Sequence, residues 1–343
     1  MKTRDEWLLA VRLRQLGDVL ASLEVLRAIK AHRPERRIAF VVNAPYAPLV
    51  EHEPYIDRVL VPPQGGAPAW IHFLREVRSL HPSAAIDLHG SARSALITRV
   101  SGAPLRVGFD VRGRRRAYNV VEARGEFTPD GRRVPHNPIV WGARLARHVG
   151  CGETNTRPPA IHTHARDSVR MRLIEAGIDG PTLDTRAIVG LNPGRAVVTK
   201  YWEPSRFIAV ARELRRDDRA VLVFWGPGEE ANAEMIAREA GALCAPALSL
   251  VEMCAALSFC AALITIDSGL KHLAVCARTP TVTVFGSTDP REWHMGDVHD
   301  VALWKGLSCS PCRRLDCPMG VPCMGIDAAA VLDALDHALG AAS

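Results

Sequence analysis

The stretch WLLAVRLRQLGDVLASLEVLRAIKAHRPERRIAFVV, residues 7–42, combines two apolar runs with a helical pattern between them. The runs Trp7–Leu13 and Ile38–Val42 predict strands, and apolar residues recur near helical spacing over Val19–Arg33. Pro34 follows directly, where it would end the helix. This alternation of strand and helix indicates a parallel sheet that helices cover on both faces.

The same alternation continues through the first half of the chain and begins again in the second half. A polar, Pro-containing segment, CGETNTRPPAIHTH (151–164), is the better linker candidate, and Pro181-Thr182 is a later alternative. We therefore expect an α/β protein with two Rossmann-like doubly wound domains, 1–160 and 161–343, facing a central cleft. Further strands are expected at Arg58–Val61, Ala84–Leu88, Ala187–Leu191, Ala220–Trp225, Ala262–Ile266 and Thr281–Phe285, and further helices at Trp70–Leu80, Ser91–Val100, Asn137–Val149, Pro204–Arg215, Glu229–Ala240, Leu250–Phe259, Leu270–Ala277 and Ala328–Leu339.

The composition is that of a folded protein. The chain has 343 residues, which suggests two domains at about 150 residues each. With 48% hydrophobic and 23% charged residues, a disordered or collagen-like chain is excluded. No apolar run approaches the roughly 18 residues that cross a bilayer, and the charged N-terminus lacks the apolar block of a secretory signal. We expect a soluble, cytoplasmic protein.

The net charge of +6 is mild, but the positive charge is unevenly distributed. Only five of the 43 basic residues are lysines, and nine arginines against four acids fall between Arg99 and Arg133. No nucleic-acid-binding motif accompanies this tract. It suits a surface that meets anionic lipid or a phosphorylated substrate, or else a solvated loop.

Polar residues follow the predicted strands at several points where a parallel sheet would bind ligands. After the first strand, Gly17 allows a tight turn and Asp18 is either a helix N-cap or a carboxylate base in the cleft. There is no GxGxxG pattern, so a dinucleotide site is not supported. In NPGRAVVTKYW (192–202), Lys200 is either a surface residue or a point charge for a diphosphate.

The loop DSGLKH (267–272) is the best candidate for a phosphate site. It follows an apolar strand and opens a helix, whose first N–H groups would bind an anion. Asp267 would orient the turn or bind a sugar hydroxyl, with His272 one turn further on; the alternative is a capped helix with a packed histidine. FGSTDP (285–290) could complete the pocket, and the acids of WGPGEE (225–230) suit ribose hydroxyls or simply the first turn of a helix.

Four of the nine cysteines fall within fifteen residues, in CSPCRRLDCPMGVPC (309–323). Cys309, Cys312, Cys317 and Cys323 could hold a structural zinc, remain free, or form a disulfide or redox pair. A four-sulfur site argues against a catalytic zinc, because it leaves no coordination position open. The other five cysteines are scattered among apolar residues and indicate a reducing compartment.

Taken together, these motifs resemble glycosyltransferase family 9, the ADP-heptose:lipopolysaccharide heptosyltransferases. The resemblance rests on RLRQLGDV, AIDLHGSARS and RVGFD in the first half, and on NPG, TKYW, DSGLKHLA, VFGSTDP and the cysteine pattern in the second. Each motif alone is weak, but their order and spacing are specific. The resemblance covers nearly the whole chain, from about Leu8 to the last helix.

This resemblance implies a GT-B fold with an acceptor-binding N-terminal domain and a donor-binding C-terminal domain. It leaves open whether the last helix packs back on the first domain. It implies an inverting transfer of heptose from ADP-heptose to an inner-core lipopolysaccharide acceptor, with no cofactor required for catalysis. The partners would be the nucleotide sugar and an anionic glycolipid, not nucleic acid, and the enzyme would be peripheral to the inner face of the inner membrane.

The resemblance also assigns roles to single residues. Asp18 matches the catalytic base, and Ser268 replaces the family's threonine but keeps the hydroxyl. Ala21–Glu24 stands where the family has Thr-Thr-Pro, a departure that borders the acceptor side. The expected donor-binding residues are Thr199, Lys200, Glu230 (or Glu229), Asp267, Ser268, Gly269 and His272, and the expected acceptor-binding residues are Arg12, Arg14, Gly17, Arg93 and Arg112.

Two alternatives remain at this point. One is a GT-B transferase that uses another nucleotide sugar. The other is a nucleotide-binding module without transferase activity, in which the cysteine cluster holds a structural metal.

Overall fold

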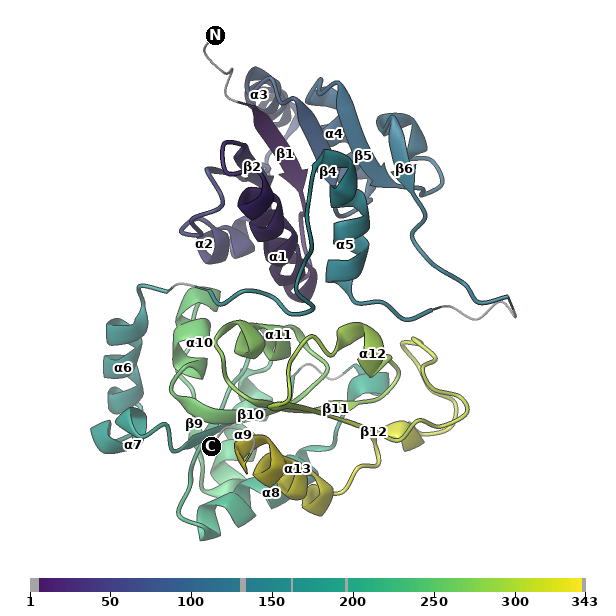
Figure 1. Cartoon of the computed structure of the whole chain (residues 1–343). Coiled ribbons are helices and arrows are strands. Elements are labelled where there is room, and N and C mark those ends of the chain that lie inside the picture. The colour runs from purple at the N-terminus through teal and green to yellow at the C-terminus, as the bar shows by residue number, and fades with distance from the viewer. Residues whose placement is uncertain (1–5, 130–133, 162, 195–196, 341–343) are drawn as a thin grey trace. The chain divides into compact units, whose positions relative to one another are not determined.

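The computed structural model describes residues 6–129, 134–161, 163–194 and 197–340. The chain divides into two compact units, Met1–His162 and Thr163–Ser343. Each unit is built on one six-stranded sheet in which all paired strands are parallel (Figure 1). No helix among the described residues combines the length and the apolar content that a membrane span requires.

The sheet of the first unit has the strand order β3-β2-β1-β4-β5-β6. Its central strands are buried at every position because helices cover both faces. The strands are β1 (Trp7–Val11), β2 (Arg37–Val41), β3 (Arg58–Leu60), β4 (Ala84–Asp87), β5 (Leu105–Phe109) and β6 (Val120–Glu122).

Two pairs of helices cover this sheet. On one face, α3 (Ala67–Ser79) and α4 (Ala92–Val100) complete a core with Phe73 and Ile97. On the other face, α1 (Leu16–His32) and α5 (Pro138–Ala146) pack against each other (Figure 1). They approach closely because α5 carries Gly142, where a Cβ would lie 2.8 Å from Val25 Cγ2. The short elements are α2 (Ala47–Val50) and the 3-10 turns Ala44–Tyr46, Arg115–Ala117 and Arg147–Val149.

The sheet of the second unit has the order β12-β11-β10-β7-β8-β9. Counted from β7, this is the same doubly wound order as in the first unit, so both halves have the Rossmann-like topology that the sequence predicts. The strands are β7 (Ile188–Asn192), β8 (Ala220–Val223), β9 (Leu243–Cys244), β10 (Cys260–Ile266), β11 (Thr281–Phe285) and β12 (Asp300–Trp304).

The helices of the second unit also form two layers. The core around Trp202 and Phe207 includes residues of α8 (Pro204–Arg216), α9 (Glu230–Ala240) and α13 (Ala328–Gly340). The last helix, α13, packs on α8 and on β10, β11 and β12, within its own unit. The remaining elements are α6 (Arg166–Glu175), which packs on α10 (Leu250–Leu257), α7 (Gly180–Asp184), α11 (Gly269–Cys276), α12 (Pro290–Trp293) and the 3-10 turns Val198–Lys200 and Pro322–Met324.

Both sheets reverse their strand order at one point, between β1 and β4 in the first unit and between β7 and β10 in the second. Open α/β sheets bind ligands beyond the carboxyl ends of the strands at such a point. At or just after the carboxyl ends of these four strands lie Asp18, Asp87, Lys200 and Asp267. The fold therefore places the candidate functional residues at these strand ends.

Candidate active site

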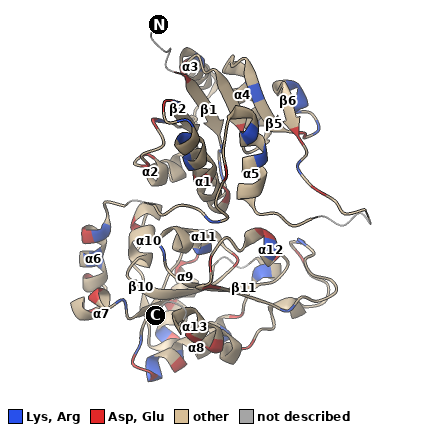
Figure 2. Ribbon diagram, viewed as in Figure 1, with Lys and Arg blue, Asp and Glu red and all other residues tan. Residues whose placement is uncertain are grey.

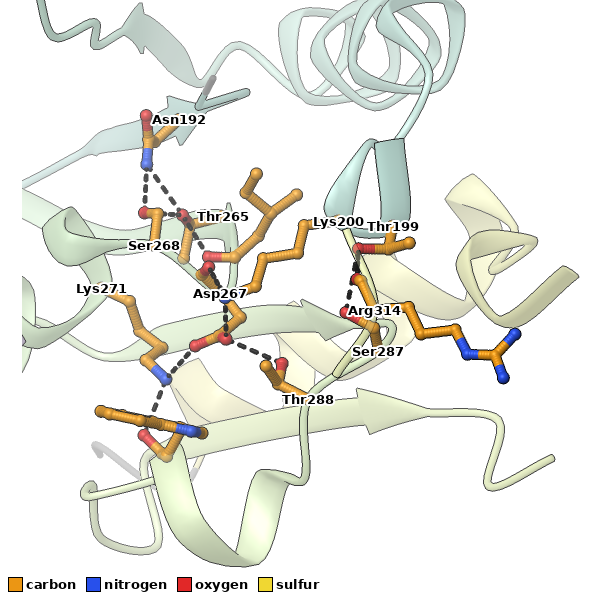
Figure 3. A network of polar contacts seen from close by, with 12 residues as sticks. Asn192, Thr199, Lys200, Thr265, Asp267, Ser268, Lys271, Ser287, Thr288 and Arg314 are labelled. Atoms are coloured by element: carbon orange, nitrogen blue, oxygen red, sulfur yellow. Dashed lines mark hydrogen bonds and ion pairs between the residues drawn. The ribbon is translucent and has the colours of Figure 1, made fainter. Parts of the chain in front are cut away.

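Lys200 and Asp267 meet at the reversal point of the second sheet (Figure 3). Lys200 ends the 3-10 turn that follows β7, and Asp267 directly follows β10. Lys200 Nζ lies 2.7 Å from Asp267 Oδ2 and donates a second hydrogen bond, of 3.2 Å, to the Asp267 carbonyl oxygen. The two charged residues that the sequence singled out separately therefore form one ion pair.

Asp267 has two more partners. Lys271 Nζ lies 3.0 Å from Oδ1, and the Thr288 hydroxyl donates to Oδ2 at 2.7 Å. Burial alone would raise the pKa of Asp267, but the charges of Lys271 and Lys200 outweigh burial and hold this pKa well below its usual range. The Asp267 carboxylate is therefore ionised and fully engaged inside the fold.

The N-terminus of α11 lies directly after this aspartate. Ser268 is the N-cap residue, but its side chain makes no cap hydrogen bond to the helix. Its hydroxyl instead accepts a 2.9 Å hydrogen bond from the side-chain amide of Asn192, whose oxygen accepts the N–H of Gly194. Ser268 therefore leaves the first-turn N–H groups, beginning with Gly269, uncapped, and this positive end of the helix suits an anion.

His272 packs behind this helix end. It is buried, its ring lies edge-on to Trp293 at 5.9 Å, and its Nδ1 has no hydrogen-bond partner among the described residues. Burial, reinforced by the charge of Lys271, lowers the pKa of His272 well below its usual range. The imidazole is therefore neutral at physiological pH.

The Thr199 side chain is hydrogen-bonded to other residues of the second unit. Its hydroxyl donates to the Arg314 carbonyl oxygen at 2.6 Å and accepts from the Ser287 hydroxyl at 3.1 Å. The two segments approach this closely only because residue 286 is glycine. A Cβ there would lie 2.4 Å from the main-chain carbonyl oxygen of Thr199. Thr199 thus ties the loop of Lys200 to the end of β11.

The two glutamates after β8 differ in their surroundings. Glu229 is half-buried and accepts the N–H of Gly226 at 2.9 Å, so its carboxylate stabilises its own turn. Glu230 is the first residue of α9 and is exposed. Of the pair, Glu230 is the carboxylate available to a ligand.

Of the alternatives left open for the cysteine cluster, a structural zinc, free thiols or a disulfide or redox pair, the structure shows free thiols. Within the part of the chain that the structure describes, no three His, Cys, Asp or Glu side chains are grouped to hold a metal ion, and all nine cysteines are free thiols. Cys309 and Cys312 are exposed, whereas Cys323 is buried in the core of the second unit. Other contacts hold this segment: the N–H of Arg313 donates to the Ser287 oxygen at 2.8 Å, and the Arg313 guanidinium pairs with Glu292.

In the first unit, Asp18 lies in the first turn of α1 and forms an ion pair with Arg12. Arg12 is buried and donates a further hydrogen bond to the carbonyl oxygen of Leu88, at the end of β4. Gln15, between them, has a φ of 70°, in the left-handed region that non-glycine residues rarely adopt. Arg12, an expected acceptor-binding residue, is thus placed to hold the Asp18 carboxylate.

The last residue of β4 and the loop after it provide functional candidates that the sequence did not single out. Asp87 is fully buried and accepts hydrogen bonds from the Tyr118 hydroxyl at 2.6 Å and from the N–H groups of His89 and Gly90 at 2.9 Å. His89 Nδ1 in turn accepts the N–H of Leu13, at 3.2 Å. Burial and neighbouring arginines lower the pKa of His89 to about 4. The motif AIDLHG was visible in the sequence, but nothing there linked it to Tyr118.

The other expected acceptor-binding residues all lie in the first unit. Gly17 is buried in α1, and Arg14 is exposed in the segment just before α1 begins. Arg93 is exposed on α4, with its guanidinium 5.3 Å from the centre of the Trp70 ring on α3. Arg112 is exposed in the loop after β5. Arg132 and Arg133, the last arginines of the Arg-rich tract, lie outside the described residues.

The model of the family described as glycosyltransferase family 9 (heptosyltransferase) matches residues 70–321, more than half of the chain. The chain belongs to glycosyltransferase family 9. This confirms the membership that the sequence motifs predicted, and it makes the protein a glycosyltransferase.

Individual relatives of this family 9 glycosyltransferase are similar to it in sequence or structure along nearly the whole chain. Lipopolysaccharide heptosyltransferase 1 of Pseudomonas aeruginosa is 24% identical over 327 residues, 90% of this chain and 86% of the relative. A solved family 9 structure from Veillonella parvula superposes with a TM-score of 0.85 at 21% identity and covers 99% of both chains. An Escherichia coli heptosyltransferase solved with ADP has a TM-score of 0.73 at 19% identity, over 97% of this chain and 99% of that one. The predicted GT-B fold, with two Rossmann-like domains, is confirmed.

Proposed function

We propose that this family 9 glycosyltransferase moves heptose from ADP-heptose to an inner-core sugar of lipopolysaccharide, with inversion at the anomeric carbon. The observation that carries the proposal is the site at the reversal point of the second sheet, where Lys200 lies next to the uncapped N-terminus of α11. An ammonium group and a helix N-terminus together suit a diphosphate. That the similar Escherichia coli structure was solved with ADP supports this choice of nucleotide.

The donor would bind to the second unit. Lys200, the N-cap Ser268 and the first N–H groups of α11, beginning with Gly269, would stabilise the negative charge that grows on the departing diphosphate. The exposed Glu230 would accept hydrogen bonds from the ribose hydroxyls. Asp267 and His272 would support this site from inside the fold rather than contact the donor, since both are buried. Because positive charge is supplied by Lys200 and the helix, transfer would not require a divalent ion.

The acceptor would bind to the first unit. Asp18 would take the proton from the acceptor hydroxyl as that oxygen attacks the anomeric carbon from the face opposite the diphosphate. The bond from the anomeric carbon to the diphosphate breaks, and ADP leaves with the electron pair. Arg12 would hold the Asp18 carboxylate in place. Arg14, Arg93 and Arg112 would meet the anionic groups of the acceptor.

We further propose that the first unit contacts the inner face of the inner membrane through a basic surface, which would make the enzyme cytoplasmic and peripheral. This basic surface consists of exposed arginines on α3, α4 and the adjoining turn Arg115–Ala117 (Figure 2). On the same two helices, Ile71 and Leu96 are about half exposed, and Glu76 is already paired with Arg58 at 2.6 Å. The residues of the basic surface are Arg75, Arg78, Arg93, Arg99, Arg115 and Arg116.

The test is incubation of the purified protein with ADP-heptose and truncated lipopolysaccharide acceptors, following ADP release and product mass. Asp18→Asn keeps the shape of the side chain but removes the base, so we expect transfer to be lost while ADP still binds. Lack of transfer by the wild type would disprove the proposed substrates. An active Asp18→Asn variant would remove Asp18 from the mechanism.

A further inference from the structure

Asp267 faces two lysines that differ in their freedom to move. The side chain of Lys200 is 30% exposed, whereas those of Lys271 and Asp267 are 2% and 5% exposed. Lys200 sits at the end of a short turn, so it can change partner. Lys271 lies one helical turn after Asp267 inside α11, so it cannot leave without breaking the fold.

Further contacts fix the Lys271 ammonium in place. It donates a 2.7 Å hydrogen bond to the carbonyl oxygen of Trp293 and lies 4.6 Å from the centre of the Phe285 ring. A buried ammonium needs a permanent counter-ion, because an unpaired charge inside a protein is strongly unfavourable. Asp267 supplies a carboxylate oxygen at 3.0 Å from the Lys271 Nζ, in direct contact with it. Lys271 and Asp267 therefore form a fixed neutral pair.

The pair of Lys271 and Asp267 determines whether the positive charge of Lys200 is compensated. Asp267 contributes one negative charge and the two lysines contribute two positive ones, so the cluster carries a net charge of about +1. Lys271 already neutralises Asp267, which leaves the charge of Lys200 uncompensated. If Lys271 were neutral, Asp267 and Lys200 would form a closed pair, and an incoming diphosphate would meet the charge of Asp267 without its counter-ion.

We propose that Lys271 is a positioning residue: it is the fixed counter-ion of Asp267, and it frees Lys200 to exchange Asp267 for a nucleoside diphosphate. The inference deepens the proposed function and rests on it for the nature of the ligand. Thr288 assists, because its hydroxyl keeps a hydrogen bond on the Asp267 oxygen that Lys200 vacates. Asp267 thus acts on Lys200 and does not itself hold the donor.

The proposal predicts a rescue that a simple packing role would not produce. Lys271→Met keeps most of the side-chain volume but removes the charge, so Asp267 should retain Lys200 and ADP binding should weaken by about tenfold or more. In the double variant Lys271→Met with Asp267→Asn, Lys200 is again uncompensated. The affinity of the double variant for ADP should return to within about threefold of the wild-type affinity.

The experiment is calorimetric titration of the full-length variants with ADP and, as a probe without phosphates, adenosine. Lys305→Met is the matched control, because Lys305 is an exposed lysine of the same unit. We expect the affinity for adenosine to stay constant throughout, and Lys305→Met to bind ADP like the wild type. Wild-type affinity in Lys271→Met, or no recovery in the double variant, would overturn the proposal.

Two further outcomes are covered by the same set of proteins. If Lys271→Met does not fold, the double variant carries the test alone, because it buries no unpaired charge: near-wild-type ADP affinity supports the proposal and a loss of about tenfold overturns it. If the wild type does not bind ADP, the proposed donor is wrong, and inorganic pyrophosphate becomes the probe with the same expected pattern. Failure of both probes to bind the wild type would overturn the role of Lys271 as well.

Discussion

Among single residues, His272 connects the donor site with the stability of the second unit. Its pKa is lowered by burial and by Lys271, so the folded protein keeps the ring neutral at pH values where the unfolded chain protonates it. The histidine therefore contributes stability above its unfolded pKa of about 6.5, and that contribution is lost as the pH falls. Below pH 6.5 the loss from one such group is about 1.4 kcal/mol per pH unit.

We predict that His272→Asn flattens the pH dependence of stability between pH 6.5 and pH 5. His89 and His294, partly buried histidines whose pKa values burial also lowers, contribute too, so the informative quantity is the difference in slope between variant and wild type. Urea unfolding at several pH values measures it, with His81→Asn, at an exposed position, as the control. Equal slopes in His272→Asn and the wild type would show that His272 is protonated in the folded state.

At this scale the sequence located charged groups but not their partners. Asp18, Lys200 and Asp267 could be found because each follows a predicted strand. The partners Arg12 and Lys271 lie within regular elements or next to them, and their contacts depend on which strands are neighbours. Lys271 did carry a local signal that was overlooked, since it is one of five lysines and lies four residues after Asp267, on the same face of the helix.

At the scale of elements, the loops after β1 and β4 are joined to each other and to the β5–β6 connection. The Tyr118 hydroxyl donates to Asp87, Asp87 holds the turn of His89, and His89 accepts the N–H of Leu13. Tyr118 can cross β5 because residue 108 is glycine, where a Cβ would lie 2.5 Å from the tyrosine ring. These contacts support the loop that carries Asp18.

Tyr118→Phe should therefore reduce catalysis without touching the donor site. We expect kcat to fall by about tenfold, with no change in ADP affinity, because the loop of Asp18 loses part of its support. The free energy of unfolding should fall by about 1–3 kcal/mol, since the buried Asp87 loses a hydrogen bond. Tyr46→Phe, in the same unit, is the control. An unchanged kcat would show that the β4 loop does not position Asp18.

The elements that the sequence missed include β6, the polar helix α6 and three strands with weak patterns. β9 has two residues, β12 is half-buried throughout, and β5 contains Arg106 and Gly108. Arg106 fits next to a buried strand because its guanidinium donates to the carbonyl oxygens of Ala103 and Ala117. The cysteine spacing left metal ligation open, because spacing allows ligation but does not decide whether three or more side chains converge on one ion.

At the scale of the whole molecule, the duplicated topology was predictable because buried parallel strands read as continuous apolar runs. β1, β4, β7 and β11 are buried at every position, and the sequence predicts each of them. The motif order also predicted the family. Where charge gathers on a surface could not be predicted, since the Arg-rich tract 99–133 supplies only part of the basic surface. Arg75 and Arg78 join it from α3 through the packing of α3 against α4.

The basic surface leads to a prediction for membrane binding. Each arginine near an anionic bilayer contributes about 1 kcal/mol, or about fivefold in binding, so replacing three should weaken vesicle binding on the order of a hundredfold. We predict this loss for Arg75, Arg99 and Arg116 replaced together by serine, measured by co-sedimentation with phosphatidylglycerol-containing vesicles. Transfer to an inner-core acceptor that lacks lipid should be unaffected, because these three arginines are distinct from the residues proposed to bind acceptor or donor.

The matched control also removes three positive charges, but from the second unit. It replaces by serine three exposed arginines of α8 and α9, namely Arg215, Arg216 and Arg238. It should keep wild-type binding to vesicles. Binding of the wild type should also weaken as salt is added, because the attraction acts over a Debye length of about 8–10 Å. Equal loss in both triple variants would mean that net charge alone governs binding. Wild-type binding that is unchanged on neutral phosphatidylcholine vesicles would show that the arginines of the basic surface do not recognise anionic lipid.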